Sequence, residues 1–183
     1  MKELSLNILD IAKNSVKAKA ENILIKLTET DETLTLIIKD DGCGMSEETV
    51  QNVMNPFYTT RTTRNVGLGV PLLKLAAEQT GGSIKIASVC EKADPVNHGT
   101  TVTAVFYKNR LDFTPLGDVI STVCILIQGS PDIEWRFVHT LKGENIELDT
   151  KELREVLGDV PLDNYEVIKW IEDYLKEGYA SIS

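Results

Sequence analysis

The chain has 183 residues, a formal net charge of −9 and 42% hydrophobic residues, values typical of a soluble globular protein with one or two domains. The excess of acidic residues argues against nucleic acid or an anionic membrane as a partner, because both bind basic protein surfaces. The sequence has no apolar run of about 18 residues, and its three cysteines lack metal or disulfide spacing, which favours a cytoplasmic location.

Residues 1–110 predict an alternation of helices and strands. Apolar residues at helical spacing indicate the helices, and period-two patterns indicate the strands. The expected elements are a helix at 3–18, strands at 21–30 and 33–40, helices at 46–54 and 70–80, and strands at 83–89 and 100–107. Ser46 is placed to cap its helix, and residues 57–69 form a loop rich in Thr and Arg.

The pattern changes from Leu111 onward. A helix started by Pro115, a hairpin around Lys142-Gly143 and two helices capped by Thr150 and Asn164 are expected there. A hairpin cannot bury its apolar face alone. We therefore predict two domains, 1–110 and 111–183, the second being a small α+β appendage packed on the first and used to recruit a partner.

Three polar residues share one face of the first predicted helix. Asp10, Asn14 and Lys17 lie at i, i+4 and i+7. An Asn amide oxygen suits Mg²⁺, a carboxylate orients water and an ammonium group binds a terminal phosphate. Taken alone, this pattern is more typical of a solvated polar face.

Glycines mark three further points. In "IIKDDGCGMS", Asp40 ends a strand before Gly42-Cys43-Gly44, where a carboxylate can accept a hydrogen bond from a purine amino group, unless the segment is a plain turn. The stretch "NVGLGVPLLKLA" leads into a helix whose free N–H groups favour phosphate. A Gly-Thr pair in "HGTTVTAVF" begins the last strand of this half.

Together, these motifs resemble the ATP-binding domain shared by histidine kinases, gyrase B-type topoisomerases, Hsp90 and MutL, over about residues 4–107. "LDIAKNSVKAKA" resembles the N box, "IIKDDGCGM" and "VGLGVPLLKLAAEQTGGSI" the two glycine boxes, "NPFYTT" the phenylalanine box of the histidine-kinase branch, and "HGTTV" the final Gly-Thr motif. The resemblance implies an α+β fold, a two-layer α/β sandwich in which helices cover a mixed sheet, with ATP and Mg²⁺ as cofactors.

The same resemblance implies a set of site residues. Asp40 is expected to read adenine, Asn14 to bind Mg²⁺, and Asp10 and Lys17 to be catalytic. The nucleotide-binding residues are expected to be Asn14, Asp40, Gly42, Gly44, Met45, Phe57, Arg61, Gly67, Leu68, Gly69, Val70 and Thr100.

Departures from the family pattern qualify this expectation. Asp10 stands where several members have a Glu base, so hydrolysis would be slow or would use a bridging water. Asn65 replaces a further glycine of the second glycine box, and Arg61 and Arg64 either contact phosphate or only solubilise the loop.

A histidine kinase carries its acceptor histidine on a helical hairpin ahead of this domain, whereas this chain starts at the N-box helix. We interpret His98 and His139 as structural. The resemblance thus implies an ATP/ADP-binding protein acting on an unidentified protein partner, either as a kinase in trans or as an ATP-gated regulator. The alternative is a non-catalytic ATP/ADP sensor and protein-binding module.

Overall fold

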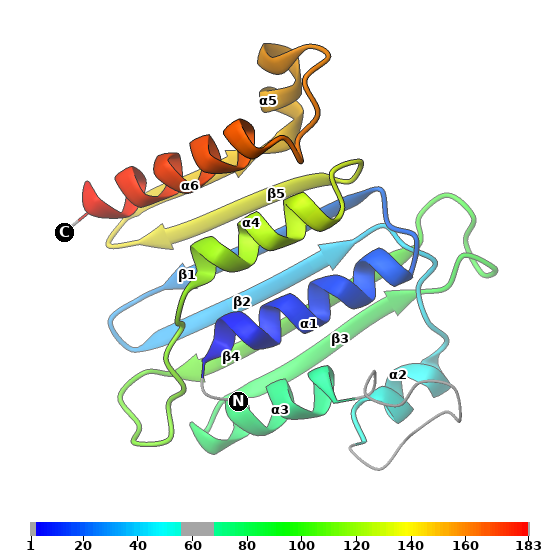
Figure 1. Cartoon of the computed structure of the whole chain (residues 1–183). Coiled ribbons are helices and arrows are strands. Elements are labelled where there is room, and N and C mark those ends of the chain that lie inside the picture. The colour runs from blue at the N-terminus through cyan, green and yellow to red at the C-terminus, as the bar shows by residue number, and fades with distance from the viewer. Residues whose placement is uncertain (1–2, 56–67, 183) are drawn as a thin grey trace.

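A six-stranded sheet forms the centre of the computed structural model, which describes residues 3–55 and 68–182 (Figure 1). The strand order is β3-β4-β2-β1-β5-β6. The strands are β1 (Asn22–Glu29), β2 (Thr33–Asp40), β3 (Ser83–Val89), β4 (Gly99–Tyr107), β5 (Glu134–Leu141) and β6 (Glu144–Asp149). The helices are α1 (Leu4–Lys17), α2 (Glu47–Val53), α3 (Gly69–Gln79), α4 (Val119–Gly129), α5 (Thr150–Leu157) and α6 (Tyr165–Ala180).

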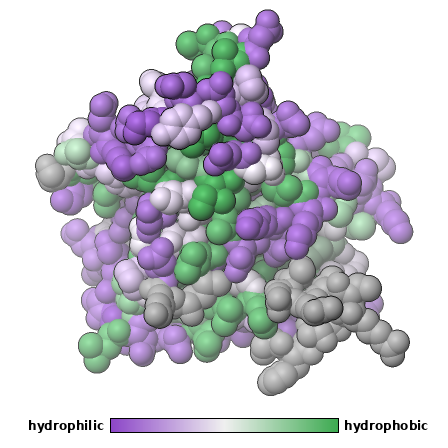
Figure 2. Space-filling model, in the orientation of Figure 1, coloured by the Kyte–Doolittle hydropathy of each residue, from purple (hydrophilic) through white to green (hydrophobic). Residues whose placement is uncertain are grey.

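The sheet is mixed because β5 runs parallel to β1, whereas the other neighbouring pairs are antiparallel. Helices α1, α3, α4 and α6 lie on one face of the sheet (Figure 1). This arrangement confirms the predicted α+β fold of helices covering a mixed sheet. Figure 2 shows that the outer surface of this helical layer is largely hydrophilic, with smaller apolar areas.

The core lies between the sheet and these helices. Alternate residues of the central strands point into it, as the period-two patterns predict: Ile23, Ile25 and Leu27 on β1, and Leu34, Leu36 and Ile38 on β2, each at most 2% exposed. Burial of one such side chain contributes roughly 1.5–3 kcal/mol. Helix α1 supplies the opposite wall, and this packing fixes its polar face relative to the end of β2.

The C-terminal residues continue the same sheet. Trp135 and Phe137 of β5 pair with Ile23 and Ile25 of β1 and are buried in the same core. The backbone N–H groups of Leu4 and Ser5, at the start of α1, donate to carbonyl groups of the segment before α4 at 2.8 Å. The division at residue 110 stays a prediction, but it does not coincide with a break in the sheet.

Helix starts agree with the sequence in part. Ser46 and Asn164 cap α2 and α6 as predicted. Helix α4 starts at Val119 with Asp118 as its cap, later than predicted, because the carbonyl groups of Pro115 and Leu116 accept hydrogen bonds from the start of α1.

Asp149, and not Thr150, caps α5. The Thr150 hydroxyl instead accepts a hydrogen bond from the backbone N–H of Trp135 at 2.8 Å. Within the part of the chain that the structure describes, no helix is both long and apolar enough to cross a membrane.

Candidate functional site

A cavity of about 390 Å³ lies between the C-terminal half of α1, helix α2, the start of α3 and the sheet. Its lining is mixed. Polar groups come mainly from α1 and the strand ends, whereas apolar groups come from α1, α2, α3 and the sheet. The lining residues are Ile11, Asn14, Ser15, Lys17, Ala18, Ile38, Asp40, Cys43, Gly44, Met45, Thr49, Val53, Val70, Ile86, Thr100 and Val102. An apolar cavity with a few convergent polar groups is the usual form of a small-molecule site.

Asp40 is the buried carboxylate of this cavity, with 8% of its surface exposed. The Ser15 hydroxyl donates to its Oδ2 at 2.5 Å, and the backbone N–H of Gly42 donates to its Oδ1 at 2.9 Å. The N–H of Thr100 approaches Oδ1 at 3.3 Å. These donors hold the carboxylate in one orientation, and Oδ2 retains a lone pair for a ligand.

The glycine turn after β2 is held against two other segments. Gly44 has φ +70°, and a Cβ there would lie 1.9 Å from the carbonyl oxygen of Val89. The N–H of Cys43 donates to Ala18 at the end of α1, and its carbonyl accepts from Glu91 after β3. The glycine is therefore required both by the turn conformation and by the close approach of β3.

Asp41 has a different role from its neighbour Asp40. Its carboxylate accepts hydrogen bonds from the backbone N–H groups of Glu21 and Asn22 and from the Asn22 side chain, at 2.8–2.9 Å. Partial burial acts to raise the pKa of Asp41, but these hydrogen bonds outweigh it and lower the pKa below its ordinary value. Asp41 thus fixes the end of β2 to the start of β1.

The three polar residues of α1 separate in space. Asn14 and Lys17 line the cavity, whereas Asp10 is exposed and outside the lining. Asp10 lies beside the start of α3, since a Cβ on Gly69 would be 3.3 Å from the Asp10 Cβ. The side-chain amide of Asn14 has no hydrogen-bond partner among residues 3–55 and 68–182.

The predicted residues are distributed as follows. Asn14, Lys17, Asp40, Gly44, Met45, Val70 and Thr100 line the cavity, and Gly42 supports Asp40 from behind it. Leu68 and Gly69 form the start of α3, with Leu68 exposed. Phe57, Arg61, Arg64, Asn65 and Gly67 lie outside the described residues.

Sequence reasoning missed nine of the lining residues, and two of these, Ser15 and Thr49, carry hydroxyl groups. Ser15 directly follows Asn14, so it faces a different direction on the helix from the polar stripe. The signal for it is indirect: a buried carboxylate requires a donor, and Ser15 is the hydroxyl next to the predicted metal ligand.

Neither histidine faces this cavity. His98 Nδ1 lies 2.5 Å from the carbonyl oxygen of Gly42. His139, 1% exposed, contacts Glu29 through Nε2 at 2.6 Å and the Tyr179 hydroxyl through Nδ1 at 2.5 Å. These contacts agree with a structural role for both residues.

Among the residues that the structure describes, Asn14 is the side chain of this cavity that suits Mg²⁺, together with a bound polyphosphate. No group of three or more His, Cys, Asp or Glu residues that could hold a metal occurs among the described residues. An unpaired amide oxygen in the cavity is a hard ligand of the kind Mg²⁺ accepts, and phosphates and water commonly complete its octahedral shell.

Comparison with known proteins decides the family. Residues 2–110 match the family described as histidine kinase-, DNA gyrase B-, and HSP90-like ATPase. The chain belongs to this family. Membership confirms the predicted resemblance and implies that this ATPase-family protein binds ATP.

Curated relatives of this family member include kinases. The sensor histidine kinase YvrG of Bacillus subtilis is 33% identical over 101 residues, covering 52% of this chain and 16% of the kinase. Sporulation kinase C of the same organism is 30% identical over 94 residues, covering 50% of this chain and 21% of the kinase. The chain thus spans less than a quarter of either kinase.

Solved structures show the same fold at 16% identity. The N-terminal domain of a DNA repair protein matches with a TM-score of 0.58, covering 87% of this chain and 58% of that one. The MutL ATPase domain of Aquifex aeolicus, complexed with ADP, matches with a TM-score of 0.54, covering 86% of this chain and 69% of that one. The family match ends at residue 110, whereas the structural match covers 87% of the chain. The likeness in fold therefore continues into the C-terminal part.

Proposed function

We propose that this family member is a Mg²⁺-dependent ATP-binding protein that acts on a protein partner, either as a kinase phosphorylating in trans or as an ATP-gated regulator. The observation that carries the proposal is the Asp40 carboxylate, buried in the cavity and held by Ser15 and Gly42. A fixed acceptor in an apolar cavity is suited to reading the amino group of one base.

Adenine would lie in the deep part of the cavity. Its amino group would donate to Asp40 Oδ2, and its ring would pack against apolar residues such as Ile38 and Val102. Guanine carries a carbonyl group at the position of that amino group, so two acceptors would face each other. The site therefore favours ATP and ADP over GTP.

The phosphates would extend toward the start of α3. The first N–H groups of a helix have no partner inside the helix, so an anion is favoured there. Asn14 would bind Mg²⁺ through its amide oxygen, and the Lys17 ammonium would balance phosphate charge. The absence of a side chain at Gly69 keeps this entrance open beside Asp10.

Two observations support a protein partner: the curated relatives include kinases, and neither histidine of this chain is free to accept a phosphoryl group from its own site. The curated relatives include kinases, yet His139 is 1% exposed and both His139 and His98 have intramolecular partners. Phosphoryl transfer requires the acceptor in line with the γ-phosphate. An acceptor residue on another chain meets this requirement better than either histidine.

One observation favours the non-catalytic alternative, an ATP/ADP sensor and protein-binding module. Asp10, the expected base, is exposed and does not line the cavity. A base must reach the water or hydroxyl from which it takes a proton. Measurement of phosphate release from ATP, compared between the native chain and Asp10→Asn, separates the two: equal and negligible rates support the sensor.

Calorimetry with ATP, ADP and GTP, each with and without Mg²⁺, tests the proposal itself. We expect binding of ATP and ADP, weak or no binding of GTP, and tighter ATP binding with Mg²⁺. Equal affinity for GTP would remove Asp40 from its role as the base-reading group.

A further inference from the structure

Ser88 on β3 ends a row of polar side chains that crosses three neighbouring strands. In the strand register, Asp40 of β2 is paired with Thr100 of β4, and Thr100 is paired with Ser88. The row next to it is apolar and borders the proposed ATP cavity through Ile38, Val102 and Ile86. The sheet therefore offers the cavity one apolar row and one polar row.

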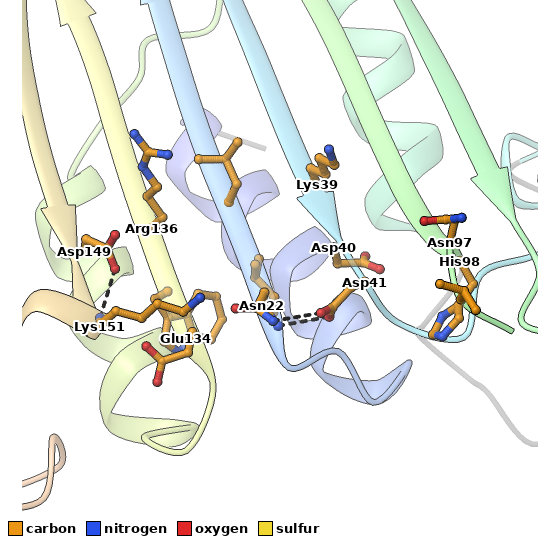
Figure 3. Close-up of a pocket in the computed structure, with 14 residues that line it drawn as sticks. Asn22, Lys39, Asp40, Asp41, Asn97, His98, Glu134, Arg136, Asp149 and Lys151 are labelled. Carbon is orange, nitrogen blue, oxygen red and sulfur yellow. Dashed lines mark hydrogen bonds between the residues drawn. The ribbon is translucent and has the colours of Figure 1, made fainter. Parts of the chain in front are cut away.

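Asp40 is the carboxylate of the polar row, and Thr100 is in direct contact with it. The backbone N–H of Thr100 approaches Asp40 Oδ1 at 3.3 Å. The next residue in the chain, Asp41, is bonded instead to Asn22 at the start of β1 (Figure 3). The Thr100 side chain is thus the neighbour of the expected base-reading group within the cavity lining.

The hydroxyl group of Ser88 has three polar contacts. It accepts a hydrogen bond from the backbone N–H of Met45 at 2.8 Å. It lies 2.7 Å from the Thr100 hydroxyl oxygen and 3.2 Å from the carbonyl oxygen of Gly99. Met45 and Thr100 line the cavity, whereas Ser88 does not. Ser88 therefore holds one lining residue of the glycine turn and one of β4 from outside the cavity.

The single proton of the Ser88 hydroxyl has two acceptors within reach. If Ser88 donates to the Gly99 carbonyl, the Thr100 hydroxyl can donate to Ser88 and presents lone pairs to the cavity. If Ser88 donates to the Thr100 oxygen, the Thr100 proton is free to point into the cavity. Rotation of two hydroxyl groups is enough to exchange these states. Thr100 can therefore act as a donor beside the Asp40 acceptor.

We propose that Ser88 is a positioning residue for base recognition, which holds the Thr100 hydroxyl as a hydrogen-bond donor toward the purine ring. This inference rests on the proposed function. Adenine places an acceptor, ring nitrogen N1, next to its amino group, so Asp40 and Thr100 supply the complementary acceptor and donor. Guanine carries a proton on N1 and mismatches both groups. A hydroxyl that accepts from Ser88 is a stronger donor, because hydrogen bonds in a chain polarise one another.

Calorimetry on the full chain tests the proposal with ADP, 1-deaza-ADP and 7-deaza-ADP, analogues in which a C–H group replaces one ring nitrogen. We expect the native chain to bind 1-deaza-ADP about three to ten times more weakly than ADP, because one hydrogen bond is lost, and to bind 7-deaza-ADP as it binds ADP. Ser88→Ala should weaken ADP binding by a similar factor. In that variant, the affinities for ADP and 1-deaza-ADP should lie within about twofold of each other. A purely structural role would weaken both ligands equally.

Two further variants serve as controls. Ser88→Thr keeps the hydroxyl on a residue type that suits a strand, so it should retain the native preference for ADP over 1-deaza-ADP. Ser83→Ala lies at the other end of β3, where Ser83 is exposed and its hydroxyl has no partner among the described residues. It should bind all three ligands as the native chain does. Melting temperatures show whether each variant is folded.

Three results would overturn the inference about Ser88 alone. The first is native affinity for ADP in Ser88→Ala, and the second is an unchanged ratio of ADP to 1-deaza-ADP affinity in that variant. The third is equal binding of ADP and 1-deaza-ADP by the native chain, a result that requires no variant. A native chain that binds no ADP would overturn the proposed function as well, so the two failures are distinguishable.

Discussion

The Ser15 hydroxyl on α1 donates a 2.5 Å hydrogen bond to the Asp40 carboxylate at the end of β2. Both side chains are buried. This bond joins the helix that carries the expected Mg²⁺ ligand to the strand that carries the expected base-reading group. Together with the core packing of α1 and the Cys43–Ala18 backbone bond, this contact holds the two halves of the proposed nucleotide site relative to each other.

Asp40→Asn should weaken ATP and ADP binding by about 1.5–3 kcal/mol, because the amide replaces a charge-assisted acceptor with a weaker one. Calorimetry checks this value. Asp41→Asn is the matched control, since Asp41 contacts β1 and does not line the cavity proposed to hold ATP. If the Asp40 variant binds ATP as well as the native chain does, Asp40 is not the group that recognises the base.

Ser15→Ala should lower both stability and ATP affinity, because the buried carboxylate loses a donor at a cost of about 1–3 kcal/mol. The higher helix propensity of Ala offsets roughly 0.5 kcal/mol of this cost. Ser5→Ala on the same helix is the control: Ser5 is buried and bonded to Glu3, away from the cavity. We expect the control to keep native ATP affinity in calorimetry even if its melting temperature falls.

Asn14→Ala should remove the Mg²⁺ dependence of ATP binding while leaving binding of the base through Asp40. The reason is that the variant loses the amide oxygen offered to the metal. Titrations with and without Mg²⁺ measure the difference, and Lys13→Ala, an exposed neighbour on α1, should retain it. A full Mg²⁺ effect in the Asn14 variant would contradict the proposed metal ligand.

Glu29 makes part of the stability dependent on pH. Its pKa is lowered, mainly by the hydrogen bond from His139 and against the opposing effect of burial, with a further contribution from Lys108. A carboxylate with a lowered folded pKa stabilises the fold above its unfolded pKa, and this contribution is lost as pH falls through the folded value. Stability should therefore decline below about pH 4.5.

Glu29→Gln should reduce that acid-dependent loss, measured as melting temperature from about pH 6 to pH 3. Glu155→Gln is the control, because Glu155 is exposed and forms no ion pair with a described residue. Parallel pH profiles for the native chain and the Glu29 variant would show that Glu29 does not contribute the expected loss of stability in acid.

Deletion of residues 111–183 should lower the melting temperature of the remainder and promote aggregation. The deletion exposes the edge of β1, which pairs with β5 in the native sheet, and uncovers the apolar residues beneath α4. Thermal melting and light scattering measure both effects. Equal melting temperatures for the truncated and full chains would support an independent ATP-binding domain.

Secondary structure and the glycine turn could be predicted from the sequence, because each depends on residues that are close together in the chain. Periods of two and 3.6 gave the strands and helices of the first half, and the glycine turn after Asp40 marked the cavity. The pairing of β5 with β1 could not be predicted from local patterns, because parallel strands that pair are far apart in the sequence. Consecutive burial of Phe137, Val138 and His139 reflects that interior position.

Misplaced helix starts have a similar cause. Thr150 has the chemistry of a cap, but its hydroxyl is used by Trp135, and Asp149 caps α5 instead. Which of two adjacent cap residues is used depends on a contact with another strand. Local propensity cannot supply that information.

The parallel pairing of β1 with β5 also sets an order of events during synthesis. Glu29 and His139, which meet across these strands, are 110 residues apart in the chain. Until β5 has emerged from the ribosome, β1 is an unpaired edge with its apolar residues already made, and closing so long a loop is slow. The nascent ATP-binding half therefore exposes an unpaired strand edge, which favours aggregation, until its C-terminal segment pairs with it.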